Sequence, residues 1–269
     1  MKKKNSILLW VFSIIFTIGI AYWQRTTGPT YPVRGNVKIN NNEIKFKLPR
    51  TSDSQTGEEI KLKITDQTVI GKFEYKRYKS HDTLTSVDML REGDYLKAII
   101  PPQPAAGKVS YNIILSTNSE TIKLEEESVV IRYKGYVPLS VLIPHIFFMF
   151  FAMLFSTRAG LEAIYKGAST YRFTFVTFVC FFIGGGILGP IVQKYAFDAY
   201  WTGWPFGHDL TDNKTLVALI FWAIAFFKLA KDKSNRKWVV IAAIVLLTVY
   251  LVPHSVLGSE IDYTQQQIK

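Results

Sequence analysis

The sequence predicts a multi-pass α-helical membrane protein with an all-β sandwich domain inserted after its first helix. Two contrasting regions lead to this fold class. Residues 137–257 are mostly apolar, with charges confined to short connectors, whereas residues 28–135 are charged and alternate apolar with polar side chains. The net charge of +11 arises from basic residues that flank apolar segments and form no groove-sized patch. We therefore expect a membrane partner and no nucleic acid.

The N-terminus carries three lysines followed by an apolar run from Ile7 to Trp23. Both an uncleaved signal anchor and a cleaved secretory signal have this pattern. Gly19 and Ala21 offer a small-x-small cleavage site, whereas the length of the run and its terminal Tyr-Trp pair favour the anchor. We therefore expect a signal-anchor helix over residues 1–27. With either alternative, the chain that follows lies outside the cytoplasm.

Residues 28–136 are expected to form an extracytoplasmic antiparallel β-sandwich. Six segments alternate apolar with polar or charged residues, as strands with one buried face do. Turn-forming stretches such as NNN, TSDSQTGE and REGD separate them. The segments are NEIKFKL, EIKLKI, VIGKFEYKRY, YLKAII, VSYNIIL and SVVIRYKGY. Their spacing predicts about six to eight short strands in two packed sheets.

One stretch of this domain, GDYLKAIIPPQPAAGKVSYNIIL, resembles the strand, proline-rich turn and strand that end fibronectin type III and immunoglobulin-like modules. In those modules a tyrosine two residues ahead of an apolar pair marks the return strand, and here that tyrosine is Tyr111. The resemblance is clear over this stretch and rests on the alternating pattern elsewhere. It implies a fold and no activity, because such modules carry many unrelated functions.

Four more apolar segments form the expected transmembrane bundle, residues 137–257, and bring the number of spans to five. Each is near the ~20 residues that cross a bilayer, and they cover residues 137–157, 172–193, 214–230 and 238–257. Lysines and arginines gather in the connectors after the second and fourth spans, which the positive-inside rule assigns to the cytoplasm. We expect a cell membrane of the bacterial inner-membrane type, with the N-terminus cytoplasmic and a C-terminal tail, residues 258–269, outside.

The connector WTGWPFGHDLTDNKT, residues 201–215, is aromatic and acidic in a chain that is otherwise basic. The topology places it on the outer side, where amphipathic rings lie at headgroup level. Its last residues open onto the fourth span, so Thr211 or Asp212 is expected to cap that helix. On the cytoplasmic side, Arg158 and Glu162 share a helix face and are expected to form a local ion pair.

Three of the four histidines fall toward the outer side of the membrane half: His145 within the second span, His208 in the aromatic connector and His254 near the end of the fifth span. An ionisable residue inside a span is costly and predicts a functional site. Four carboxylates from the connector and the tail accompany them, namely Asp209, Asp212, Glu260 and Asp262. Together these residues are the expected ligands of a transition metal. Alternatively, His145 and His254 hold a b-type haem between two helices.

Each of these residues also has a structural explanation. His145 follows Pro144 and can satisfy a backbone carbonyl that a helix kink frees. His254 can lie among headgroups, and the tail carboxylates can be solvated. The outer half of the third span contains glycines that admit either a neighbouring helix or a flat macrocycle, and these are Gly184, Gly185, Gly186 and Gly189. The lone cysteine, Cys180, excludes an intrachain disulfide.

Three functions stay open at this point. The first is a metal- or haem-bearing membrane protein in redox chemistry or metal handling. The second is a non-enzymatic assembly subunit whose β-sandwich binds an extracytoplasmic protein. The third is a metal-dependent lipid-modifying enzyme that uses a zinc-bound water. The sequence contains no phosphate loop, CxxC motif or paired nucleophile and base, so it does not decide whether the protein is an enzyme.

Overall fold

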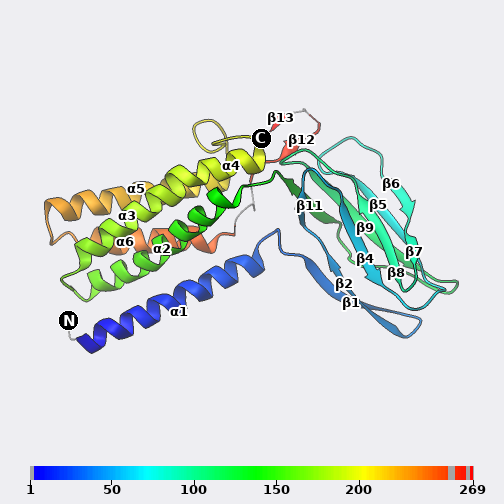
Figure 1. Ribbon diagram of the computed structural model, residues 1–269, viewed down its shortest axis with the longest axis horizontal. Coiled ribbons are helices and arrows are strands. Elements are labelled where there is room, and N and C mark those ends of the chain that lie inside the picture. Colours follow the sequence, from blue (N-terminus) through cyan, green and yellow to red (C-terminus); the bar gives the residue numbers. More distant parts are fainter. Residues whose placement is uncertain (1–2, 254–257, 265–266, 269) are drawn as a thin grey trace. The chain divides into compact units, whose positions relative to one another are not determined.

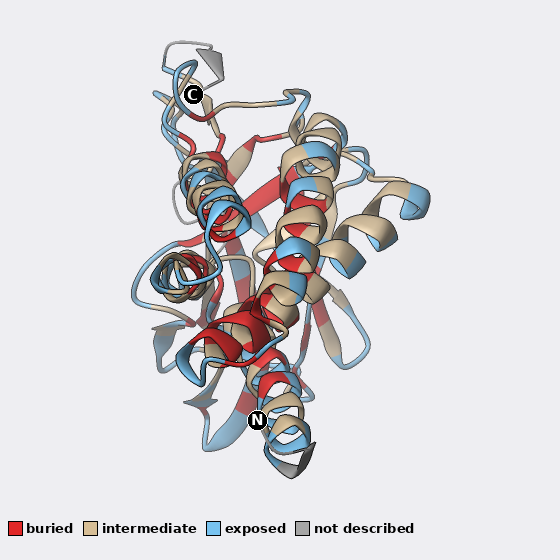
Figure 2. Ribbon diagram, turned by 90° about the vertical axis from the view of Figure 1, so that its left-hand side faces the viewer, coloured by how far each residue is buried: buried red, intermediate tan, exposed pale blue. Residues whose placement is uncertain are grey.

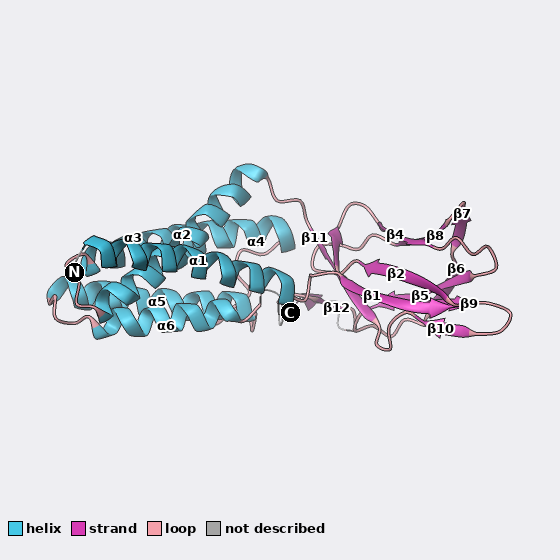
Figure 3. Cartoon of the chain, turned by 90° about the horizontal axis from the view of Figure 1, so that it is seen from below, coloured by secondary structure: helices cyan, strands magenta, loops and turns pink. Residues whose placement is uncertain are grey.

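The computed structural model describes residues 3–253, 258–264 and 267–268. The chain forms two compact units, each described by itself below. The helical unit comprises Met1–Gly28 and Val137–Gly258, and the β unit comprises Pro29–Tyr136 and Ser259–Lys269. One unit consists of helices and the other of strands, as Figures 1 and 3 show. The residues that follow Gly258 belong to the β unit, which the sequence pattern did not predict.

The helical unit consists of the five apolar segments that the sequence predicts. They are α1 (Lys3–Thr27), α2 (Leu139–Ile164), α3 (Thr170–Phe181) with the π-helix η1 (Phe182–Leu188) and α4 (Gly189–Phe197), α5 (Leu210–Lys231) and α6 (Lys237–Leu251). Within the described residues, four helices are long and apolar enough to cross a membrane, with α3, η1 and α4 counted as one. The fifth, α6, is apolar and 15 residues long.

Small residues line the contacts between the helices. Ala159 of α2, Ala218 and Ala225 of α5 and Ala242 of α6 are fully buried, and Trp222 fills the space beside them. Small side chains let helix backbones approach closely, which favours helix association in an apolar environment. Buried residues therefore follow the inner faces of the helices, whereas residues on the outer faces are exposed or only partly buried (Figure 2).

Contacts between helices define two ends of this unit. At one end, the Arg158 guanidinium of α2 donates a hydrogen bond to Ser6 of α1. At the other end, Gln24 of α1 donates to the Tyr250 carbonyl of α6 at 2.8 Å. The turns between α2 and α3 and between α5 and α6 lie at the Arg158 end. These turns and their flanks carry seven of the ten lysines and arginines in Val137–Gly258, namely Lys166, Arg172, Lys228, Lys231, Lys233, Arg236 and Lys237.

The β unit contains the six predicted strands together with shorter ones. The predicted segments correspond to β2 (Asn42–Leu48), β4 (Glu58–Lys63), β5 (Ile70–Arg77), β8 (Tyr95–Ile100), β9 (Lys108–Ser116) and β11 (Val129–Lys134). The additional strands are β1 (Val33–Ile39), β3 (Thr51–Asp53), β6 (Thr85–Asp88), β7 (Leu90–Glu92), β10 (Thr121–Lys123), β12 (Ile261–Asp262) and β13 (Gln267–Ile268). The strand content is therefore higher than the sequence pattern indicates.

Two sheets share one apolar core in the β unit. The larger sheet has the order β3-β11-β9-β5-β6, with β10 on β9, and the smaller has the order β4-β8-β7. The hairpin β1-β2 lies beside β4. All pairs are antiparallel except β3 with β11. The core joins Phe73, Tyr111 and Ile131 of one sheet to Ile60 and Leu96 of the other.

Candidate functional site

The N-terminus of α5 is capped by Asp209. Its Oδ1 accepts hydrogen bonds from the backbone amides of Thr211 at 2.7 Å and Asp212 at 3.3 Å. The sequence had placed the cap at Thr211 or Asp212, and that prediction is wrong. The helix begins at Leu210, one residue after Asp209, so Asp212 lies within its first turn. A carboxylate at the N-cap satisfies amides that have no partner within the helix.

Because it is not needed as the cap, Asp212 connects three elements. Its buried carboxylate accepts hydrogen bonds from the Thr202 amide at 2.7 Å, the Gln193 side chain at 3.0 Å and the Thr202 hydroxyl at 3.2 Å. Gln193 belongs to α4, Thr202 to the loop and Asp212 to α5. Neither Gln193 nor Thr202 was predicted as a site residue, since neither lies in a recognisable motif. Asp212 therefore fixes the loop against both flanking helices.

The loop between α4 and α5, residues 200–209, is called the aromatic loop below. The Asn213 side chain accepts a hydrogen bond from the Trp204 amide at 2.6 Å, and the Thr202 carbonyl accepts one from the Asp209 amide at 3.1 Å. A Cβ atom on Gly203 would lie 2.6 Å from the Asp212 Cβ, so only glycine allows this approach. The loop backbone is thus fixed on α5 by several contacts.

Three large aromatic side chains project from this fixed backbone. Tyr200 is 60% exposed, Trp204 67% and Phe206 83%. Large aromatic side chains that stay exposed on an ordered loop are unusual, because aqueous exposure forgoes the free energy of burying them. The loop therefore presents an apolar surface that either a bilayer or another protein can cover.

Lys214, in the first turns of α5, binds backbone carbonyls at the C-terminal end of α6. Its buried ammonium donates hydrogen bonds to the Val252 carbonyl at 2.6 Å and to the Pro253 carbonyl at 3.4 Å. These carbonyls follow the last residue of α6. A cation at a helix C-terminus interacts favourably with the helix dipole and satisfies its free carbonyls. Lys214 thereby joins α5 to α6 at the same end of the unit as the aromatic loop.

His145 contacts the π-helix across the α2–η1 interface. Its Nδ1 lies 3.0 Å from the Gly184 carbonyl oxygen, which also accepts a hydrogen bond from the Gly189 amide. Since a carbonyl only accepts, Nδ1 carries the proton that is donated to it. A Cβ atom on Gly184 would lie 3.0 Å from the Phe148 Cβ, so the glycine permits the approach of α2. The expected satisfaction of a backbone carbonyl by His145 thus occurs in the neighbouring helix.

The predicted metal ligands are distributed over both units. His208 is exposed, and Asp209 and Asp212 bind backbone amides and the Gln193 side chain. Glu260 and Asp262 belong to the β unit, and His254 lies outside the described residues. Within the described part of the chain, no three His, Cys, Asp or Glu side chains are arranged to hold one metal ion. A metal or haem site that uses His145 and His254 stays a prediction.

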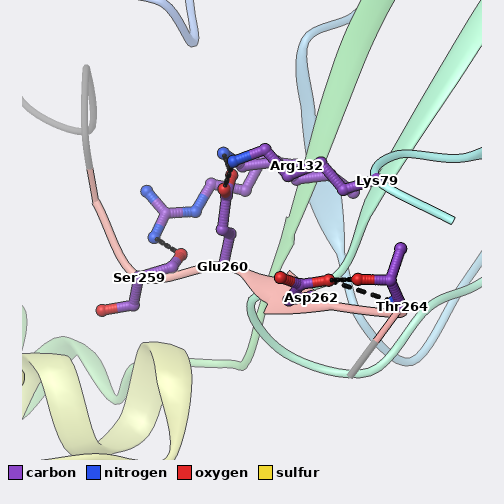
Figure 4. A network of polar contacts seen from close by, with 7 residues as sticks. Lys79, Arg132, Ser259, Glu260, Asp262 and Thr264 are labelled. Carbon is purple, nitrogen blue, oxygen red and sulfur yellow. Dashed lines mark hydrogen bonds and ion pairs between the residues drawn. The ribbon is translucent and has the colours of Figure 1, made fainter. Parts of the chain in front are cut away.

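The tail carboxylates bind to groups of the β unit. Glu260 forms ion pairs with Lys79 and Lys108, and Asp262 accepts a hydrogen bond from the Thr264 amide at 3.0 Å (Figure 4). Burial alone would raise the pKa of the Glu260 carboxyl, but hydrogen bonds from the two lysines outweigh this effect and lower the pKa. Glu260 is therefore a partly buried anion that is paired within the β unit, in contrast to the solvated residue that one alternative expected.

The predicted ion pair between Arg158 and Glu162 is present and buried. Arg158 Nη1 lies 2.6 Å from Glu162 Oε2, and the two side chains are 1% and 3% exposed. Glu162 also accepts a hydrogen bond from the Ser169 amide at 3.2 Å, at the turn into α3. The Arg158 guanidinium lies over the rings of Phe173 and Trp10, at 4.8 and 5.5 Å from their centroids. The pair therefore connects α1, α2 and α3 at the end opposite the aromatic loop.

No protein-family model, curated protein or solved structure matches this chain. Its function is therefore inferred from the arrangement of its own side chains. The described residues contain a buried ion pair, a carboxylate held by two lysines and a fixed loop with exposed aromatic rings. The first two are satisfied internally, whereas the aromatic loop has an uncovered apolar surface.

Proposed function

We propose that this protein is an integral membrane assembly subunit that binds another protein outside the cytoplasm and catalyses no reaction itself. The aromatic loop carries this proposal. Its exposed Tyr200, Trp204 and Phe206 stand on a backbone that Asp212 and Asn213 fix. Large aromatic residues dominate the binding energy of many protein interfaces. A loop that is already ordered loses little conformational entropy on binding.

Two features of the helical unit support its insertion in a membrane. The first is the outer face of α1, where Ile7, Leu8, Ile15 and other apolar side chains are exposed. The second is the gathering of cations at the Arg158 end. The positive-inside rule assigns that end to the cytoplasm, as expected for a bacterial inner membrane. The aromatic loop, at the opposite end, then faces the extracytoplasmic side.

The strand order of the β unit supports an immunoglobulin-like module. Such sandwiches pack one sheet, with strands A, B, E and D, on a second sheet with strands C, F and G. A characteristic tyrosine lies near the start of strand F. Here β4-β8-β7 packs on β6-β5-β9-β11, and Tyr111 of β9 donates a hydrogen bond to the Pro49 carbonyl at 2.8 Å. Modules of this kind are widespread in cell-surface proteins, and binding is a common role of their exposed edges.

Replacing Trp204 and Phe206 together by serine tests the proposed function. We expect the native membrane complex to weaken by more than about tenfold, because truncating one interface hot spot already costs about 2 kcal/mol or more. The measurement is native gel electrophoresis of mildly solubilised membranes, combined with in-membrane crosslinking. The wild-type chain should migrate above its own mass and the double variant at the mass of the isolated subunit.

The matched control is Tyr22→Ser in α1. Tyr22 is 70% exposed and lies near Gln24, which contacts α6 at the same end of the helical unit as the aromatic loop. If the loop only anchored the helices among headgroups, both changes would have the same effect. An unaltered complex in the Trp204/Phe206 variant, or an equal loss in Tyr22→Ser, contradicts a protein-binding role for the loop.

A further inference from the structure

The C-terminal segment, defined as Ser259–Thr264, is bound along one end of the β unit. Glu260 lies between the ammonium groups of Lys79 and Lys108. The Arg132 guanidinium donates a hydrogen bond to the Ser259 carbonyl at 2.6 Å, as Figure 4 shows. The Ile261 amide donates one to the Ala106 carbonyl at 3.2 Å. The segment is therefore recognised by its charge and by its extended backbone.

Tyr263 occupies a separate position on the same surface. Its hydroxyl donates a hydrogen bond to the Gln103 side chain at 3.0 Å, and the Arg77 guanidinium lies 4.6 Å from its ring centroid. A Cβ atom on Gly107 would lie 2.6 Å from the Tyr263 hydroxyl oxygen. Glycine at this position therefore leaves the space that the phenol occupies. The surface thus contacts two side chains of the segment, Glu260 and Tyr263, which lie three residues apart in the sequence.

Three cations of this surface contact the C-terminal segment. Lys79, Lys108 and Arg132 are called the basic docking site below. Among the described residues, Lys79 and Lys108 form ion pairs with Glu260 alone. Burial lowers the pKa of the Lys108 ammonium, and its hydrogen bond to Glu260 offsets part of this effect. Without a carboxylate between them, these like charges repel one another, so an unfilled site favours any ligand that supplies one.

The bound segment leaves room beside it. A pocket of about 250 Å³ is lined by Arg77 and Gln103, which both contact Tyr263, and by Asp82, Thr83 and Thr85 among others. All of its lining residues lie between Tyr75 and Val109. A peptide that makes the same contacts and continues into this pocket gains surface that the chain's own segment does not use. Such a peptide competes with a tethered segment whose effective concentration is about millimolar.

We propose that the basic docking site binds extended peptides with the pattern Glu-x-x-Tyr, and that the C-terminal segment occupies it until a partner supplies such a peptide. The contacts correspond to peptide recognition by backbone hydrogen bonds together with pockets for selected side chains. The inference rests on the proposed function in one respect, because the competing peptide belongs to the assembly partner. The site itself is testable without that partner.

The test uses the otherwise complete chain ended after Gly258 and purified in detergent. The probe is a fluorescein-labelled synthetic peptide, SEIDYTQQQIK, and its binding is followed by fluorescence anisotropy. We expect saturable binding that weakens at least tenfold between low and high salt, as expected for partly exposed ion pairs. The full chain should bind the probe at least tenfold more weakly, because its own segment fills the site. A probe with lysine at the glutamate position should not bind.

Three further variants make the result unambiguous. Glu260→Lys in the full chain releases the segment without shortening the protein, so it too should bind the probe if the truncated chain does not fold. Within the truncated chain, Lys108→Glu should abolish binding, whereas Lys47→Glu on β2, an equal charge change at an exposed position, should not. The proposal is overturned by absence of saturable binding in both tail variants, by equal binding of the lysine-containing probe, or by equal binding to the full chain.

The outcome is independent of the aromatic loop. If the probe binds but the Trp204/Phe206 variant keeps its complex, the docking site stands and the proposed role of the loop is wrong. If the variant loses its complex but the probe does not bind, the assembly function stands without this docking site.

Discussion

Replacing Arg158 by methionine is expected to lower the free energy of unfolding of the helical unit by about 3–5 kcal/mol. The change leaves the Glu162 carboxylate buried without the guanidinium that lies 2.6 Å from it. It also removes the contacts of Arg158 with Trp10 and Phe173. The measurement is reversible unfolding in mixed micelles, followed by tryptophan fluorescence. The double variant Arg158→Met, Glu162→Gln should be more stable than Arg158→Met alone, because no unpaired charge remains.

The chain contains a matched control for this prediction. Lys194 and Asp198 form an ion pair with the same i, i+4 spacing at 2.7 Å, but their side chains are 42% and 79% exposed. Exposed pairs contribute at most about 1 kcal/mol, so Lys194→Met should change stability far less than Arg158→Met. Equal effects of the two substitutions would show that the Arg158 pair does not connect the helices as its burial indicates.

Replacing Asp212 by alanine should release the aromatic loop. The change removes the acceptor of the Thr202 amide and of the Gln193 side chain. A buried polar group left without a partner costs about 1–3 kcal/mol. Hydrogen exchange of residues 200–209 should therefore accelerate, and the native complex should be lost as in the Trp204/Phe206 variant. α5 itself should persist, because Asp209 still caps it.

Asp212→Asn is the control for this change, since its amide oxygen still accepts a hydrogen bond from the Thr202 amide. It should retain most of the protection of the loop and most of the complex. Slow exchange in residues 200–209 of the alanine variant would contradict the role assigned to Asp212. An intact complex with a fully mobile loop would instead contradict the need for an ordered aromatic surface.

The helices and the longer strands could be predicted from the sequence because their signals are local. Crossing a bilayer needs a long apolar run, and a half-buried strand needs alternation. The strand β1 (Val33–Ile39) was not predicted because three of its four inward positions, Val33, Gly35 and Val37, are small or only partly buried, and Ile39 alone is fully buried. The very short strands β3, β6, β7 and β10 are defined by their neighbours in the sheets more than by their own residues.

The candidate sites were predictable only in part, because they join residues that are distant in the chain. Glu260 pairs with Lys79 across 181 positions, and no local pattern indicates such a contact. The glycines of FFIGGGILGP were recognised as close-packing residues, but the π-helix that brings Gly184 to His145 was not. Similarly, Asp212 was expected as a cap from its position before the fourth span. Its contact with Gln193 could not be predicted, because that contact depends on how the loop folds back.

The most direct test of the account is the accessibility of single cysteines in intact cells. With Cys180 replaced by alanine, cysteines are placed at the exposed positions of Phe206 in the aromatic loop, Ser86 in the β unit and Ser234 between α5 and α6. A membrane-impermeant maleimide should label positions 206 and 86 from outside, and position 234 only after permeabilisation. Labelling of positions 206 and 86 from opposite sides of the membrane, or of position 234 from outside, would contradict an extracytoplasmic assembly subunit with a cytoplasmic basic end.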